Sequence, residues 1–242
     1  RGDRIVYLTA KTITRTVAEE SVKKLKDKSL KCKSITLTAK EKICFKEKSS
    51  CNPENCEYAL NYYDKVNNVI FNILKEEDTF TREKIEEYAK KEKLCPFELS
   101  LDLSLWCDLI ICDYNYAFDP RARLKRFFED DVGNNVLLVD EGHNLVDRSR
   151  SMFSAEIYKD KILKASKVIK GKAPNLFKAL NAINKYLIEI RKELQEAEVN
   201  SLYKKDEYKD LYKLLRIFMK ECDEYLVKSA NTEGYDEIKD LY

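Results

Sequence analysis

Short runs of β-branched and apolar residues alternate with helical segments over the first 145 residues of this 242-residue chain. Residues 5–9 and 34–38 are rich in Ile, Thr and other strand-forming residues, whereas residues 109–112 and 136–139 are continuous apolar runs. Strands that alternate with helices pair in parallel, and strands covered on both faces are apolar throughout. The sequence therefore predicts a parallel α/β sheet in which the last two strands are buried.

Two stretches depart from this alternation. Residues 40–106 interrupt it with a cysteine-containing loop region and helices, and after about residue 150 no strand pattern recurs. The predicted segments are 1–39 and 107–150 for the sheet, 40–106 for an inserted domain and 151–242 for an all-helical part. The chain has only 5 Gly and 4 Pro, which favours long helices. The predicted helices cover about 12–28, 57–76, 81–93, 96–106, 119–128, 160–170, 174–197 and 204–228.

Composition excludes some classes of protein and leaves others open. Apolar residues make up 44% of the chain, so a sizeable core can form, and 45 Lys and Arg nearly balance 43 Asp and Glu. The net charge of +2 means that a basic path for nucleic acid would need local segregation of charge. No apolar run reaches the roughly 18 residues of a membrane span, and the N-terminus does not resemble a secretory signal. We expect an intracellular protein, cytoplasmic if bacterial, cut from a longer chain that continues before Arg1.

A pair of acidic residues follows the last apolar run. Asp140 and Glu141 come directly after residues 136–139, at the strand end where open α/β sheets bind ligands. In a nucleotide hydrolase, Asp140 would hold Mg²⁺ and Glu141 would orient and deprotonate the attacking water. His143, the single histidine, would couple this site to neighbouring motifs. The alternative is a pair of surface acids without a catalytic role.

Eight cysteines are many for a chain without a secretory signal. Reduced thiols in such a protein are candidates for metal or cluster ligation. Cys107 and Cys112 flank an apolar run and are expected in the core, and Cys222 lies in a charged helix and is expected to be inert. The spacing of the others does not match the paired Cys-x₂-Cys knuckles of a zinc ribbon.

Several motifs together resemble the XPD/DinG family of iron–sulfur DNA helicases, in that family's order from about residue 5 to about residue 158. Asp140-Glu141-Gly142-His143 resembles its DEAH box, with Gly142 in place of the usual Ala. The other matching segments are 14–17, 42–44, 55–58, 95–97 and 114–120.

The resemblance implies a partial RecA-like motor domain with an inserted [4Fe–4S] domain, followed by the start of a helical arch. It selects Cys44, Cys51, Cys56 and Cys95 as cluster ligands, with Cys32 as a possible substitute for Cys51. Similar helicases thread single-stranded DNA, which needs cations for phosphates and aromatic faces for bases. The candidate DNA-binding residues are Arg15, Thr16 and Tyr116, and further Lys46, Lys48, Tyr62 and Tyr63. The basic run 121–126 is expected to be a solvated helix face.

The implied parent protein is a monomeric ATP- and Mg²⁺-dependent helicase that moves on single-stranded DNA and unwinds forked duplexes in repair or replication. A Gly-rich loop ending in Gly-Lys-Ser/Thr would hold the triphosphate, and these 242 residues contain none, so the chain by itself is expected to be inactive. One alternative is a non-catalytic iron–sulfur or zinc module that binds nucleic acid or a partner protein. Another, suggested by residues 160–228 alone, is a structural helical scaffold.

Overall fold

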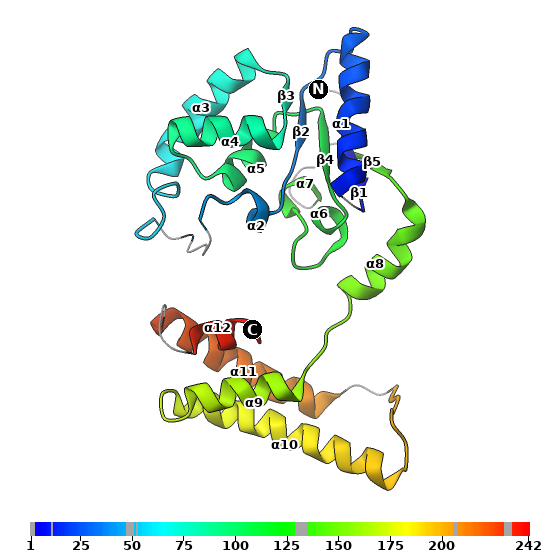
Figure 1. The fold of residues 1–242 in the computed structure, drawn as a ribbon, viewed down its shortest axis with the longest axis vertical. Coiled ribbons are helices and arrows are strands. Elements are labelled where there is room, and N and C mark those ends of the chain that lie inside the picture. The colour runs from blue at the N-terminus through cyan, green and yellow to red at the C-terminus, as the bar shows by residue number, and fades with distance from the viewer. Residues whose placement is uncertain are drawn as a thin grey trace. The chain divides into compact units, whose positions relative to one another are not determined.

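The computed structural model describes residues 3–10, 12–46, 51, 53–128, 135–205, 208–229 and 234–242 (Figure 1). The chain forms two compact units, Arg1–Ala155 and Glu156–Tyr242. Each unit has its own hydrophobic core, so each is described by itself.

The first unit is built on a five-stranded parallel sheet, which confirms the predicted fold class. Its order is β3-β2-β4-β1-β5, with β4 and β1 at the centre. The register places Ile110 beside both Val6 and Ile35. The strands are β1 (Arg4–Thr9), β2 (Ser34–Thr36), β3 (Thr79–Phe80), β4 (Leu109–Asp113) and β5 (Asn135–Val139).

Alternate residues of the central strands pack on opposite faces of the sheet, as the two-residue period of a strand requires. Tyr7, Leu109 and Ile111 face helix α1 (Thr12–Asp27), whose Ala18 and Val22 complete a small cluster. Figure 1 shows α1 lying along this face. Val6, Leu8, Ile110 and Cys112, which alternate with these residues, enter the main core of the unit.

The inserted segment covers the second face. Its helices are α2 (Lys40–Ile43), α3 (Tyr62–Glu76), α4 (Arg82–Glu92) and α5 (Pro96–Ser104). Pro96 occupies the first turn of α5, where its missing N–H leaves no hydrogen bond unmade. Ile73, Ile85 and Leu99 belong to the same core as Ile35, so this segment shares a core with the sheet.

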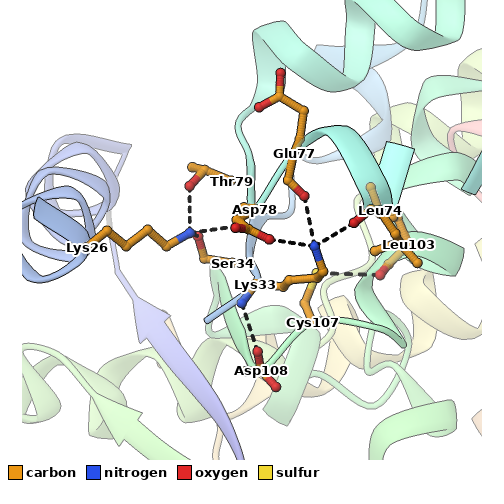
Figure 2. Close-up of polar contacts among 10 residues, drawn as sticks. All are labelled: Lys26, Lys33, Ser34, Leu74, Glu77, Asp78, Thr79, Leu103, Cys107 and Asp108. Carbon is orange, nitrogen blue, oxygen red and sulfur yellow. Dashed lines mark hydrogen bonds and ion pairs between the residues drawn. The ribbon is translucent and has the colours of Figure 1, made fainter. Parts of the chain in front are cut away.

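Two lysines tie the insertion to the sheet (Figure 2). The Lys33 ammonium donates to the carbonyls of Leu74 and Glu77, at 2.7 and 3.0 Å, and pairs with Asp78 at 2.5 Å. Leu74 and Glu77 lie at the C-terminus of α3, where carbonyls lack helical partners and attract cations. Lys26 on α1 donates to Ser34 of β2 at 2.9 Å and to Thr79 of β3 at 2.6 Å.

The prediction that residues 136–139 form a buried strand is wrong as to burial. They form β5, but their side chains are 37–44% exposed. The cause is position: within the described residues β5 pairs only with β1 and forms one edge of the sheet. An apolar run indicated a strand correctly but did not show where in the sheet the strand lies.

Two predicted helices of the first unit begin later than expected. The helix placed at 119–128 is reduced to α7 (Lys125–Phe128), because the Asp119 carboxylate accepts hydrogen bonds from the backbone N–H groups of Arg121 and Ala122. Asp often stabilises a turn in this way at the expense of a helix. The helix expected from residue 57 starts at Tyr62, after Asn61 in a left-handed conformation with φ of 54°. The short elements between β4 and residue 155 are α6 (Asn115–Phe118), η1 (Gly142–Asn144) and α8 (Leu145–Met152).

All regular secondary structure in the described part of the second unit is helical. The helices predicted at 160–170 and 174–197 are confirmed within one residue at each end. The helix predicted at 204–228 begins only at Lys209, and the last short helix was not predicted. Ile162, Leu180, Phe218 and Ile238 form its core. Gly234 precedes the last helix with φ of 95°, and a Cβ atom there would lie 2.9 Å from Val168, so glycine is required. No described helix is long and apolar enough to cross a membrane. The helices are α9 (Lys159–Ile169), α10 (Pro174–Glu196), α11 (Lys209–Lys228) and α12 (Tyr235–Lys239).

The Lys33 contacts lead to a first prediction. Lys33→Met should lower the free energy of unfolding of the first unit by about 1–2 kcal/mol, because three carbonyl or carboxylate acceptors lose a charged donor. Trp106 is the single tryptophan and lies in this unit, so urea unfolding followed by its fluorescence reports on this unit alone. Lys31→Met, at an exposed position, is the control and should change stability by less than about 0.5 kcal/mol. Equal effects of the two substitutions would contradict the proposed tie.

Candidate functional site

Four cysteines line one cavity of about 250 Å³ in the inserted segment. Cys44 follows the last residue of α2 and Cys95 is the N-cap of α5. Cys56 lies in the turns before α3, and Cys51 lies in the loop between Cys44 and Cys56. These are the four cysteines that the sequence resemblance selects, and three different local structures bring them to one place.

The surroundings of the cavity control the state of two of its groups. Burial raises the pKa of the Cys95 thiol, although N–H groups of Glu98 and Phe97 at the start of α5 partly oppose this. A free Cys95 is therefore a neutral thiol at pH 7, and ligation would be needed to hold it as a thiolate. A hydrogen bond with Cys51 raises the pKa of the Lys40 ammonium. Lys40 thus supplies a positive charge beside the sulfurs.

The chemistry of these donors fits an iron–sulfur cluster. Cluster irons are held by thiolates, each iron of a cubane taking one, so the sulfurs surround a body and do not converge on a point. A structural zinc instead draws its four ligands to about 2.0–2.3 Å of one ion. Among the described residues, no three His, Cys, Asp or Glu side chains are placed to hold a single metal ion.

The other cysteines lie elsewhere. Cys32 lines a separate, mostly apolar cavity between α1 and the sheet. Cys107 and Cys112 are buried in the core of the first unit, as predicted. Cys222 is fully buried in the core of the second unit, on the inner face of a helix whose outer face is charged.

A larger groove, of about 660 Å³, opens at the carboxyl ends of the central strands. Thr9 ends β1, Leu37 follows β2 and Asp113 ends β4, and all three line the groove. This is the edge at which parallel α/β sheets bind ligands. Four cationic side chains also line it, namely Arg15, Lys40, Lys42 and Arg121.

Arg15 and Tyr116, two of the predicted DNA-binding residues, meet in this groove. One guanidinium nitrogen of Arg15 donates to the Thr38 hydroxyl at 3.5 Å, while its Nε is buried and has no hydrogen-bond partner in the part of the chain that the structure describes. The Tyr116 hydroxyl donates to the Thr38 carbonyl at 3.5 Å, and burial raises its pKa to about 12. Both side chains therefore contact Thr38.

The remaining predicted DNA-binding residues do not share this groove. Thr16 is exposed on α1 and does not line it. Tyr62 is buried and donates to Asp102 at 2.9 Å, so its proposed role in stacking is not supported by its position. Tyr63 is 83% exposed and, with Lys46, lines the cysteine cavity. Lys48 lies outside the described residues.

The acidic motif follows the edge strand. Asp140 N donates to the Leu8 carbonyl at 3.0 Å, which continues the β1–β5 ladder, and the buried Tyr114 donates its hydroxyl to the Asp140 carbonyl. Glu141 adopts a left-handed conformation with φ of 51°, and strained backbone of this kind clusters at functional sites. The Glu141 carboxylate lies 3.3 Å from Nδ1 of His143. Both side chains are exposed, as access to a ligand requires.

Several residues that line the groove were not predicted from the sequence. Lys40 and Lys42 lie on the short helix before Cys44, and Arg121 lies in the turn that Asp119 organises. The basic run that includes Arg121 was expected to be solvated. Arg121 is 82% exposed, in agreement with this expectation, whereas Arg126 in the same run pairs with Asp102 at 2.9 Å. A turn signal from Asp119-Pro120 could have separated the two arginines.

Comparison with known proteins identifies the family. The family model named DEAD_2 matches residues 9–162, which is well over half of the chain. The chain belongs to the DEAD_2 family. This family includes the XPD-like helicases, so the resemblance seen in the motifs is confirmed.

Curated relatives of this DEAD_2 chain carry helicase names. The XPD/RAD3 helicase subunit of the general transcription and DNA repair factor IIH from Saccharomyces cerevisiae is 26% identical over 182 residues, which cover 75% of this chain and 20% of that protein. A regulator of telomere elongation helicase 1 homolog from Caenorhabditis elegans is 37% identical over 76 residues, 30% of this chain and 7% of that protein. The chain thus spans a fifth or less of these relatives.

Solved structures support the fold of the DEAD_2 chain. A truncated XPD superposes with a TM-score of 0.53 at 16% identity, covering 99% of this chain and 69% of that one. A structure titled XPD helicase gives 0.50 at 15% identity, covering 99% of this chain and 40% of that one. The RecA-like α/β architecture is therefore shared.

The cavity gives a second prediction, which separates Cys51 from its possible substitute. Anaerobically purified Cys51→Ser protein should lose most of its iron and its visible absorbance, because one thiolate of the cluster is missing. Cys32→Ser should keep about four irons per chain, since Cys32 lies in a different cavity. Iron analysis and absorbance spectra measure both. Iron retained by Cys51→Ser and lost by Cys32→Ser would contradict the assignment.

Proposed function

We propose that this chain is part of an ATP-dependent DNA helicase that binds single-stranded DNA in the strand-end groove and holds a [4Fe–4S] cluster in the cysteine cavity. One observation carries the proposal. The sheet that presents Arg15 and Tyr116 in a groove at its carboxyl edge also ends β5 in the Asp140-Glu141 pair. A DNA-binding groove and an acidic nucleotide motif on one sheet are what a translocating motor needs.

The groove fits a single strand through two kinds of group. Cations from Arg15, Lys40 and Arg121 can neutralise phosphates, and the rings of Phe97 and Tyr116 offer faces on which bases can stack. The near-neutral overall charge does not oppose this, because the cations are gathered locally. Such contacts bind single strands with little preference for sequence.

The acidic motif is assigned to nucleotide chemistry. Asp140 would hold Mg²⁺, Glu141 would orient the attacking water, and His143, in contact with Glu141, would connect the site to neighbouring motifs. Because the sequence contains no Gly-Lys-Ser/Thr loop, the 242 residues alone are not expected to turn over ATP. We also propose that the longer protein unwinds forked duplexes in repair or replication, because its relatives are named as helicases.

The cluster would have a structural role in the inserted segment. Cys44, Cys51, Cys56 and Cys95 would hold it, and when bound it would supply cross-links between the loop, α2 and α5. The cysteine cavity and the groove share Lys40 and Phe97, whose ammonium and ring centroid lie 5.8 Å apart. Ligation of the cysteines is therefore expected to hold Lys40 and Phe97 in place, and with them one wall of the DNA groove.

A third prediction tests DNA binding by the purified chain. Arg15→Gln should weaken binding of a fluorescent poly-dT oligonucleotide by about tenfold or more, the effect of losing one charge-assisted hydrogen bond. It should also reduce the slope of log affinity against log salt by about 0.7, the value for one phosphate contact on a single strand. Fluorescence anisotropy over a range of salt concentrations measures both quantities.

The matched control is Lys23→Gln, which removes the same charge from an exposed position on the same helix, outside the groove. It should leave both affinity and slope nearly unchanged. Equal losses from the two substitutions would show that binding depends only on net charge. Absence of any binding by the wild-type chain would remove the support for a DNA groove.

A further inference from the structure

Residues 113–116, the last residue of β4 and the three that follow it, contact two sites. Asp113, Asn115 and Tyr116 line the DNA groove. Tyr114, between them, is fully buried and donates its hydroxyl to the carbonyl of Asp140 in the acidic motif. Three of these four consecutive residues thus line the groove, and the fourth contacts the strand end that carries the acidic pair.

A second contact joins the same segment to the helix that follows the acidic motif. One Arg148 guanidinium nitrogen, on α8, lies 3.2 Å from a carboxylate oxygen of Asp113 and 3.2 Å from the side-chain oxygen of Asn115. The same Asp113 oxygen accepts the backbone N–H of Asn115 at 2.9 Å. Arg148 therefore clamps two groove-lining side chains and does not itself line the groove.

We propose that Arg148 is a positioning residue that transmits strand binding in the groove to the acidic motif, through Asp113 and Asn115. A strand that contacts Asn115 and Tyr116 would fix the turn after β4, and the clamp would then fix α8 and the preceding residues 140–144. This inference rests on the proposed DNA groove, but the contact itself is independent of any DNA.

The contacts of Arg148 with Asp113 and Asn115 are expected to contribute little to the stability of the fold, which favours a role in coupling the groove to the acidic motif. The side chains of Arg148 and Asp113 are each 40% exposed, and ion pairs at that exposure contribute little to folding. Arg148 also leaves a buried Nε without a hydrogen-bond partner among the described residues, which offsets part of what its other contacts contribute. The contacting guanidinium nitrogen carries two N–H groups, so it can donate to the Asp113 carboxylate and the Asn115 amide oxygen together.

Hydrogen exchange of the cluster-containing chain, with and without saturating poly-dT oligonucleotide, tests the proposal. In the wild type, the oligonucleotide should slow exchange of amides in residues 139–148 about fivefold. In Arg148→Met this slowing should disappear while groove residues 113–118 remain protected by DNA. Arg148→Lys should restore it only in part, and Tyr114→Phe should reduce it through the second contact.

The control is Arg150→Met, on the same helix, whose guanidinium pairs with Asp147 at 3.2 Å and is 76% exposed. It should retain the wild-type response. If the oligonucleotide still slows amide exchange of residues 139–148 fully in Arg148→Met, the proposal is refuted. It is also refuted if Arg148→Met speeds exchange of these residues equally with and without the oligonucleotide, because the contact is then only structural. If the wild-type chain binds no DNA, both this inference and the proposed function fail, whereas binding without a response in residues 139–148 sinks the inference alone.

Discussion

The parallel pairing of β4 with β1 on one side and β2 on the other is the interaction on which the rest of the first unit depends. It aligns the carboxyl ends of three strands, so that Thr9, Leu37 and Asp113 lie at one edge and open a groove there. β1 extends the alignment to β5, which ends at Asp140. Residues more than 100 positions apart in the chain become neighbours because of this register alone.

The inserted segment adds a second constraint, since it is attached to the sheet at two levels. Lys33 and Lys26 hold the C-terminus of α3 and the strand β3 (Figure 2). At the groove, Lys40 on α2 and Phe97 on α5 belong to the walls of both the groove and the cysteine cavity. Ligation of the cysteines is therefore expected to affect the shape of the groove directly, through the side chains that the two sites share.

Sequence patterns predicted the order of the elements well, because strand and helix periods are local. The four predicted strands and the helices at 96–106, 160–170 and 174–197 are present within about two residues, whereas the short elements β3 and α12 were not predicted. Burial of residues 136–139 could not be predicted, since it depends on which strand lies at the edge. The turn at 119–124 depends on one side chain, Asp119, that competes with the helix for backbone N–H groups.

In the candidate site, too, local motifs were predicted correctly and contacts between distant segments were not. Motif order selected the four cysteines that line one cavity, and Arg15 and Tyr116 that line one groove. It did not reveal Lys40, Arg121 or Arg148, because their roles come from contacts between segments far apart in sequence. The position of Tyr62 does not support the stacking role considered for it, because its ring is buried and its hydroxyl donates to Asp102, a contact that no local pattern indicates.

Photo-crosslinking with a single-stranded oligonucleotide that contains 5-iodouracil tests the central claim most directly, because it reports which aromatic side chains touch bases. The account predicts that mass spectrometry will locate the crosslinks at Tyr116 and Phe97, the rings that line the strand-end groove. Crosslinks confined to exposed tyrosines away from the groove, such as Tyr203 or Tyr212, would contradict it.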